Sequence, residues 1–451
     1  MPAAYLVPHP PLLVPGVGQG DEIPQTRAAY ETVAAETAAL HPETVVIISP
    51  HSVMYADYIH ISPGKSASGS FAAFGAGHIR ISAAYDDELA ARMEDAAKEA
   101  GIFAGTQGEK DPSLDHGALV PLYFLKSPRI VRVSLSGLSM TDHYRFGMCV
   151  RQAAESLPRE TILIASGDMS HKLKDDGPYG FAKEGPEHDA FVQECICAGD
   201  FRKLMRIEPS LCERAAECGM RSLAVLAGYL DGWKVESRLL SYEGPYGVGY
   251  LTAAFSGDEK APSLLPDILA DQNAAMEAAR AQEDAFVRLA RQNTEHYVQT
   301  GQTIGLPDDL PEEMLQRRAG AFVSIHKDGN LRGCIGTIEP VQDNIALEIL
   351  ANSVSAAVHD TRFDPIAADE LEKLTYHVDV LSPPEPIQSA DQLDVIRYGV
   401  IVSRGNRRGL LLPNLDSIDT VEKQISIALQ KGGIRPEESY GMERFEVKRH
   451  S

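Results

Sequence analysis

The sequence predicts two domains, an α/β domain followed by a smaller α+β domain. Its 451 residues exceed what one hydrophobic core usually organises. The first half alternates short apolar runs with helical segments, whereas the second half shows a hairpin-like pair, a helix and further strands. With 44% hydrophobic and 24% charged residues, the composition is that of a globular protein able to bury substantial cores.

The apolar runs of the first half are typical of buried, partly parallel strands. These runs lie at 44–51, 129–137 and 160–170, and the helical segments lie at 86–101 and about 187–206. Such a rhythm of strand and helix predicts an α/β domain.

A composition shift marks the predicted domain boundary. An apolar strand-like run at 247–255 is followed by a stretch rich in Ser, Gly and Pro that then becomes helical. We therefore predict an N-terminal domain over 1–256, a linker over 257–276 and a C-terminal domain over 277–451.

The second domain begins with a predicted β-hairpin. AFVSIHKDGNLRGCIGTI contains a turn signal at Asp328, Gly329 and Asn330. The helix-like run NIALEILANSVSAAV follows, and then the strand-like runs LTYHVDVLS and YGVIVSRGNRRGLLLP. This order predicts an α+β fold.

Charge and cysteine content exclude some classes of protein. The 64 acidic residues outnumber the 42 basic ones, for a formal charge of -22, which disfavours nucleic acid and anionic membrane surfaces as partners. The six cysteines form no C-x-x-C pair, which fits a reducing compartment. Without an apolar run long enough to span a bilayer or a basic leader, the chain is expected to be soluble and cytoplasmic.

Three predicted strands each lead into a histidine: AAYLVP into His9, TVVIISP into His51, and TILIASGDMS into His171. Open α/β sheets bind ligands beyond the carboxyl ends of their strands. If these strands are neighbours, three imidazoles converge on one crevice, as a metal ion with open coordination positions requires. His60, His78, His143 and His188 lack this placement and are interpreted as surface or core residues.

A fourth candidate is His116, in the segment SLDHGA that opens an apolar helical run. Asp115 before it has the character of a helix cap. The macrodipole disfavours a protonated imidazole at a helix start, so a neutral, proton-accepting His116 is expected.

The segments VPHPPLLVPGVG, ISPHS, DHGALVPL and SGDMSH resemble, in order and spacing, class III extradiol ring-cleavage dioxygenases of the LigB type and their Memo relatives, over about residues 1–256. The resemblance implies a central mixed sheet flanked by helices. It also implies a non-haem Fe(II) site bound by His9 and His51, with His171 and His116 on the side of a catechol-like substrate and His171 as the principal acid/base. Asp168 is given a supporting role.

The third metal ligand has two candidates, because Glu217 and Cys218 are adjacent in ERAAECGMRSLAV. The resemblance implies a glutamate in ring-cleaving members and a cysteine in the Memo branch. On a helix, adjacent side chains point about 100° apart, so only one would reach the site. A carboxylate with two imidazoles suits Fe(II) and O2, and we predict Glu217 with Cys218 as the alternative. The same ligands with zinc would support hydrolysis.

In the second domain, the hexapeptide LRGCIG places Arg332 two residues before Cys334. An arginine beside a thiol favours thiolate and makes Cys334 a candidate nucleophile, although a strand cysteine is more often inert. With HDTRFDPI, HVDVLSPPEPI and GLLLPN, the hexapeptide resembles the AMMECR domain over about residues 280–451. The resemblance implies a site around the hexapeptide, with His359 and Arg362 nearby.

Both domains in one chain resemble the AmmeMemoRadiSam arrangement, which implies a radical S-adenosylmethionine (SAM) protein as partner. This chain lacks the C-x-x-x-C-x-x-C motif of such an enzyme. The sequence therefore favours an Fe(II)-dependent extradiol-type dioxygenase acting on a small aromatic. The alternative is a Memo-like metal-binding adaptor, or redox partner of a radical SAM enzyme, without ring-cleavage activity.

Overall fold

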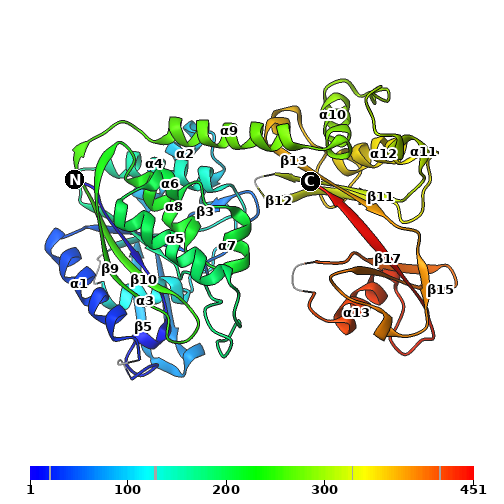
Figure 1. Cartoon of the computed structure of the whole chain (residues 1–451). Coiled ribbons are helices and arrows are strands. Elements are labelled where there is room, and N and C mark those ends of the chain that lie inside the picture. Colours follow the sequence, from blue (N-terminus) through cyan, green and yellow to red (C-terminus); the bar gives the residue numbers. More distant parts are fainter. Residues whose placement is uncertain (20–21, 126–128, 328, 416–417) are drawn as a thin grey trace. The chain divides into compact units, whose positions relative to one another are not determined.

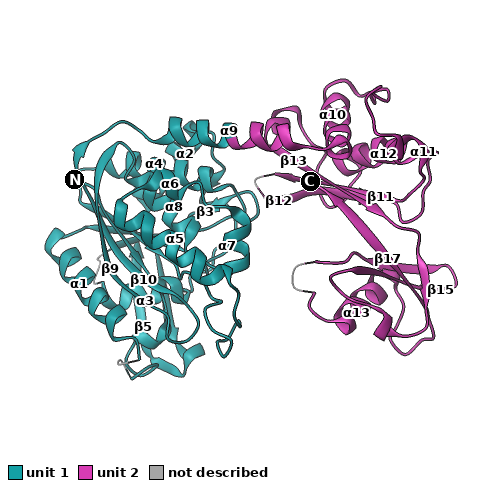
Figure 2. Cartoon of the chain, in the orientation of Figure 1, with its two compact units in different colours: residues 1–274 teal, residues 275–451 magenta. Residues whose placement is uncertain are grey.

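The chain forms two units, residues 1–274 and 275–451 (Figure 2). The computed structural model describes residues 1–19, 22–125, 129–327, 329–415 and 418–451. The segment predicted as a linker, 257–276, contains the end of strand β10 (Tyr250–Lys260) and much of helix α9 (Leu265–Gln282). Regular structure therefore continues through the boundary.

An eight-stranded mixed sheet forms the centre of the first unit (Figure 1). Its order is β4-β5-β7-β2-β8-β1-β10-β9. Besides β10, the strands are β1 (Ala3–Val7), β2 (Thr44–Ser49), β4 (Ser66–Phe71), β5 (Ala76–Tyr85), β7 (Arg129–Ser134), β8 (Thr161–Ser166) and β9 (Trp233–Glu243). The five strands β5, β7, β2, β8 and β1 run parallel, and β4, β10 and β9 pair antiparallel with their neighbours.

Helices cover both faces of this sheet, because its parallel strands are apolar on both sides. In β1, Leu6 packs into a core with α2, α4, α5 and α8, whereas Tyr5 packs into a second core with α1 and α3. The helices are α1 (Pro24–Leu40), α2 (Asp87–Glu99), α3 (His116–Phe124), α4 (Met140–Glu155), α5 (Glu184–Ala198), α6 (Phe201–Leu204), α7 (Pro209–Ala215) and α8 (Met220–Tyr229). The predicted α/β architecture is confirmed.

The second unit contains an antiparallel sheet with the order β12-β11-β13-β17-β15-β16, and β14 pairs with β17. The strands are β11 (Ala321–Lys327), β12 (Asn330–Gly336), β13 (Leu374–Leu381), β14 (Glu385–Ile387), β15 (Tyr398–Arg404), β16 (Arg407–Leu411) and β17 (Gly441–His450). The predicted hairpin joins β11 to β12, with Lys327 opposite Asn330. Gly329 takes φ +80°, and Asp328 lies outside the described residues.

Helices pack on the sheet of the second unit in two places. Val323 and Ile325 of β11 join a core with α10 and α12, and a smaller core forms between α13 and the β15–β16 pair. The helices are α10 (Ala285–Thr300), α11 (Glu312–Gln316), α12 (Ile345–Val358) and α13 (Val421–Gly432). The predicted α+β fold is confirmed. Among the residues described in either unit, no helix is both long and apolar enough to cross a membrane.

Candidate metal centre

The predicted histidine-bearing strands are direct neighbours in the sheet. Strand β8 pairs in parallel with β1 on one side and with β2 on the other. The carboxyl ends of all three therefore meet at one edge, where His9, His51 and the loop 167–171 follow them. This edge holds the candidate site.

Three imidazoles converge there. Nε2 of His9 lies 2.9 Å from Nε2 of His51. The rings of His51 and His116 stack with centroids 4.1 Å apart, and the His9 and His116 centroids are 5.2 Å apart. One ring nitrogen of each histidine lies within 4.8 Å of the other two. His9 is 2% exposed, whereas His51 is open to solvent, so the cluster is accessible from one side.

A second group of possible ligand atoms shares His9. Its Nε2 is 3.7 Å from Oδ2 of Asp168 and 3.8 Å from Sγ of Cys218. The backbone N–H of His9 also donates to Oδ1 of Asp168 at 2.9 Å. Nε2 of His9 thus lies where imidazole, carboxylate and thiol meet.

Two glycines allow the Asp168 and Cys218 loops to touch. A Cβ on Gly167 would lie 2.3 Å from Cα of Gly219, so any side chain there would force the loops apart. The contact lets the backbone N–H of Cys218 donate to the carbonyl of Asp168 at 3.2 Å. In return, the backbone N–H of Asp168 donates to Sγ of Cys218 at 3.2 Å, an interaction that favours a thiolate.

Glu217 points elsewhere. It lies with Cys218 in the turn between α7 and α8, which begins where Ala216 takes φ +54°. The Glu217 carboxylate accepts the backbone N–H of Met220 at 2.7 Å, in the first turn of α8. Within the described ranges, both groups of possible metal ligands omit Glu217, and the second includes Cys218. Of the two candidate third ligands, Cys218 is thus the one grouped with His9, in a group that does not contain His51.

His171 also faces the cluster. Burial, together with the neighbouring His51, lowers the pKa of His171 to about 4. Its Nε2 is buried and has no hydrogen-bond partner among the described residues. Burial and His51 likewise lower the pKa of His116 to about 4. Both imidazoles are therefore neutral near pH 7 and able to accept a proton.

Asp115 and Arg132 hold the start of α3. As predicted, Asp115 caps this helix, accepting the N–H of Ala118 at 3.2 Å, and it also accepts the hydroxyl of Ser49. The buried guanidinium of Arg132 donates to the carbonyls of Asp111 and Ser113 and lies 3.6 Å from Asp115. These contacts place His116 against His51.

The donor set fits a metal ion. Burial lowers the pKa of His9 well below its usual value, which preserves a lone pair. Burial also raises the pKa of Asp168 to about 7 and the pKa of the Cys218 thiol well above its usual value. A bound cation would offset the cost of burying the charged carboxylate and thiolate, because metal ligation requires neutral imidazole, carboxylate and thiolate.

Two exposed aromatic residues at the cluster were missed by sequence reasoning. Phe74 lies edge-on to His116 with centroids 5.6 Å apart, and Tyr179 lies against His171 at 5.0 Å. Their exposed fractions are 39% and 58%. A Gly- and Pro-rich loop holds Tyr179, but composition gave no sign that it would reach a histidine.

The other first-half histidines lie outside both ligand groups. His60, His143 and His188 are buried, and His78 is exposed. His143, for example, is bound through Nδ1 to the carbonyl of Ser139 and through Nε2 to the N–H of Ser136.

In the second unit, charged groups around the hexapeptide are paired. The Arg332 guanidinium binds both carboxylate oxygens of Glu370, at 3.0 and 2.9 Å. Cys334 instead accepts the hydroxyl of Ser324 at 3.2 Å. Its backbone N–H donates to Asp360, which is paired with Arg362 at 2.7 Å. His359 ends α12.

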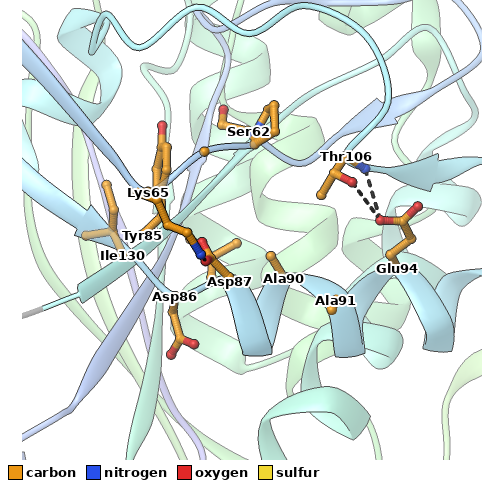
Figure 3. Close-up of a pocket in the computed structure, with 13 residues that line it drawn as sticks. Ser62, Lys65, Tyr85, Asp86, Asp87, Ala90, Ala91, Glu94, Thr106 and Ile130 are labelled. Atoms are coloured by element: carbon orange, nitrogen blue, oxygen red, sulfur yellow. Dashed lines mark hydrogen bonds and ion pairs between the residues drawn. The ribbon is translucent and has the colours of Figure 1, made fainter.

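A cavity of about 300 Å³ lies elsewhere in the first unit. It opens between α2, the ends of β5 and β7 and the loop 62–65, where Glu94 reaches Thr106 (Figure 3). None of the residues that line it belongs to the histidine cluster.

Each of the two units matches a known protein family. Residues 3–253 match the family described as catalytic LigB subunit of aromatic ring-opening dioxygenase, and residues 287–450 match AMMECR1. Protein CA_C1420 of Clostridium acetobutylicum is 40% identical, across 99% of this chain and 98% of that protein. A Thermotoga maritima protein is 50% identical across 37% of this chain and 98% of its own length.

Two solved structures are similar in part. Uncharacterized protein PH0010 from Pyrococcus horikoshii is 31% identical with a TM-score of 0.34, covering 36% of this chain and 88% of that one. Uncharacterized protein JW3007 from Escherichia coli K12 is 14% identical with a TM-score of 0.38, covering 56% of this chain and 99% of that one.

Proposed function

Because this chain belongs to the family of catalytic LigB subunits of aromatic ring-opening dioxygenases and carries an AMMECR1 domain behind that subunit, we propose that its first unit is a metal-dependent oxidoreductase that opens the ring of a small catechol-like aromatic with O2. One observation carries the proposal: Nε2 of His9 lies among ligand atoms of His51, Asp168 and Cys218.

The metal in this proposal is Fe(II), held by His9, His51 and Cys218. Cys218 is the alternative third ligand from the sequence, and the backbone N–H that its sulfur accepts favours the thiolate form that a metal ion requires. When bound, the ion would supply the Lewis-acid and electron-transfer chemistry that ring opening by O2 requires.

The neutral imidazoles of His116 and His171 would take up the protons that a catechol releases on binding. Their low pKa values keep both imidazoles unprotonated near pH 7. The exposed rings of Phe74 and Tyr179 offer flat apolar surfaces beside these two bases, and aromatic groups pack favourably on such surfaces. Together these side chains would orient a planar substrate with its hydroxyls toward His9 and His51.

The activity test uses the full chain purified without oxygen and loaded with Fe(II). We expect about one iron per chain and O2 uptake with at least one member of a panel of catechols, with the ring-opened product identified by mass spectrometry. His171→Gln should lower turnover by about 100-fold while iron content stays the same. Iron binding without turnover on the whole panel would contradict ring opening.

The ligand test compares three variants by titration with Co(II), whose thiolate complexes absorb in the near ultraviolet. Cys218→Ala should abolish that absorption and weaken Co(II) binding by about 100-fold. Glu217→Gln and the matched thiol control Cys212→Ala should leave both unchanged. Loss of binding in Glu217→Gln alone would restore the carboxylate as third ligand.

The position of Cys218 also favours a second function. A thiolate ligand suits softer metals, and the resemblance associates a cysteine with the Memo branch. In this alternative the first unit is a metal-binding adaptor or redox partner of a radical SAM protein. It predicts tight metal binding through Cys218, a stable complex with that protein in pull-down, and no O2 uptake with catechols.

A further inference from the structure

A buried hydroxyl lies directly behind His9. Ser166 is the last residue of β8 and is 0% exposed. Its Oγ donates to the backbone carbonyl of Gly117 at 2.7 Å, and the same oxygen lies 3.0 Å from Nδ1 of His9. Ser166 thereby links the first histidine of the cluster to α3, the helix that begins with His116.

The direction of these hydrogen bonds follows from the chemistry of the three groups. A backbone carbonyl can only accept, so the single hydroxyl proton of Ser166 is committed to Gly117. The serine oxygen must then accept from Nδ1 of His9, which therefore carries the imidazole proton. Nε2 of His9 is left with its lone pair directed at the cluster.

The carbonyl of Gly117 is available because of a proline. In an α-helix, this carbonyl would accept the N–H four residues later. That residue is Pro121, which lies inside α3 and has no N–H. The orphaned carbonyl accepts the Ser166 hydroxyl instead.

We propose that Ser166 is a positioning residue: it holds His9 in the Nδ1–H tautomer, so that Nε2 presents its lone pair to a metal ion. The metal-binding part rests on the proposed function, whereas the tautomer does not. Oδ2 of Asp168, 3.7 Å from Nε2, competes for the same imidazole proton. Without Ser166, that carboxylate would draw the proton to Nε2 and block the lone pair.

The test measures the tautomer and the metal affinity separately. Long-range ¹H–¹⁵N spectra of the metal-free full chain, labelled at histidine nitrogens, report which nitrogen is protonated, and His9→Ala identifies the His9 signal. We expect protonation on Nδ1 in the wild type. Ser166→Ala should move the proton toward Nε2 and weaken Zn(II) binding by about 10- to 100-fold.

Two further variants separate this role from general packing. Ser166→Thr keeps the hydroxyl and should restore both the tautomer and Zn(II) affinity relative to Ser166→Ala. Ser134→Ala is the matched control, because Ser134 ends β7, a parallel strand of the same sheet, is 1% exposed and accepts the N–H of His60 instead of contacting His9. It should change neither quantity.

Two results would overturn the proposal: a wild-type His9 that carries its proton on Nε2, or a folded Ser166→Ala variant with unchanged tautomer and unchanged Zn(II) affinity. The wild-type spectrum decides the tautomer even if Ser166→Ala fails to fold. If the tautomer is as expected but the wild type binds neither Zn(II) nor Fe(II), the proposed function fails and the assignment of Ser166 to His9 stands.

Discussion

The two motif regions of this chain differ in how their polar groups are partnered. Around His9, imidazole, carboxylate and thiol atoms face one another within 4.8 Å. Around Cys334, guanidinium and carboxylate groups are already paired: Arg332 with Glu370 and Arg362 with Asp360. The first arrangement could hold a cation, whereas the second pairs its opposite charges within the protein.

The largest expected effect comes from removing the shared ligand. His9→Ala should weaken Zn(II) binding by at least about 100-fold in isothermal titration calorimetry, because both ligand groups include His9. Arg332→Met, in the paired region, should leave Zn(II) binding unchanged. Comparable losses in both variants would contradict the distinction between the two regions.

The next effect concerns stability of the second unit. Glu370 accepts from both Arg332 and Lys327, so Glu370→Gln leaves two cations without their carboxylate and should cost about 2 kcal/mol of unfolding free energy. Hydrogen exchange of β12 peptides in urea measures this loss of unfolding free energy. Tryptophan fluorescence would not report it, because the one tryptophan, Trp233, lies in the first unit.

Glu385→Gln is the matched control for that measurement. Glu385 pairs with Arg444 but is 67% exposed, against 14% for Glu370, so its loss should cost less than about 0.5 kcal/mol. Equal costs would show that burial does not distinguish the two pairs.

A smaller effect is a dependence on pH that belongs to the paired region. Although burial opposes it, the hydrogen bonds from Arg332 and Lys327 lower the pKa of Glu370 to about 2 from its usual 4.5. A carboxyl whose pKa is lower in the folded than in the unfolded chain stabilises the fold fully at pH values above the unfolded pKa. This contribution is lost as the pH falls from about 4.5 toward 2. The stability gap between wild type and Glu370→Gln should therefore be larger in urea titrations at about pH 6 than at about pH 3. A constant gap would contradict this assignment.

The smallest effect is expected at the hexapeptide thiol. Cys334→Ser keeps an acceptor for the Ser324 hydroxyl and should change unfolding free energy by less than about 1 kcal/mol. Zn(II) affinity should be unchanged. Loss of Zn(II) affinity in this variant would show that the Cys334 thiol itself binds Zn(II).

Apolar patterning was sufficient for the fold class of both units, because buried strands and amphipathic helices follow from residue spacing. It also placed His9 and His51 at strand ends. It could not choose between Glu217 and Cys218, because that choice depends on Ala216, a non-glycine residue in the left-handed region. This turn directs one side chain to the start of α8 and the other to His9.

The sequence also did not reveal which residues distant along the chain form ion pairs or hydrogen bonds. Arg332 meets Glu370 across 38 positions, so its nearness to Cys334 along the chain was a poor guide to its partner. The bond between Ser166 and Gly117 leaves one sequence trace, a proline four residues after the glycine. The proline indicates a carbonyl without its helical partner, but only the contact between β8 and α3 shows that Ser166 donates to it.

The contact between Gly167 and Gly219 has a consequence for how this protein can evolve. A change at position 168 or 218 alters the ligand atoms and hence the preferred ion, while the loops stay in place. A side chain at position 167 would meet the opposite backbone at 2.3 Å and displace both loops together. Lineages of this fold should therefore exchange one metal for another more readily than they lose either glycine.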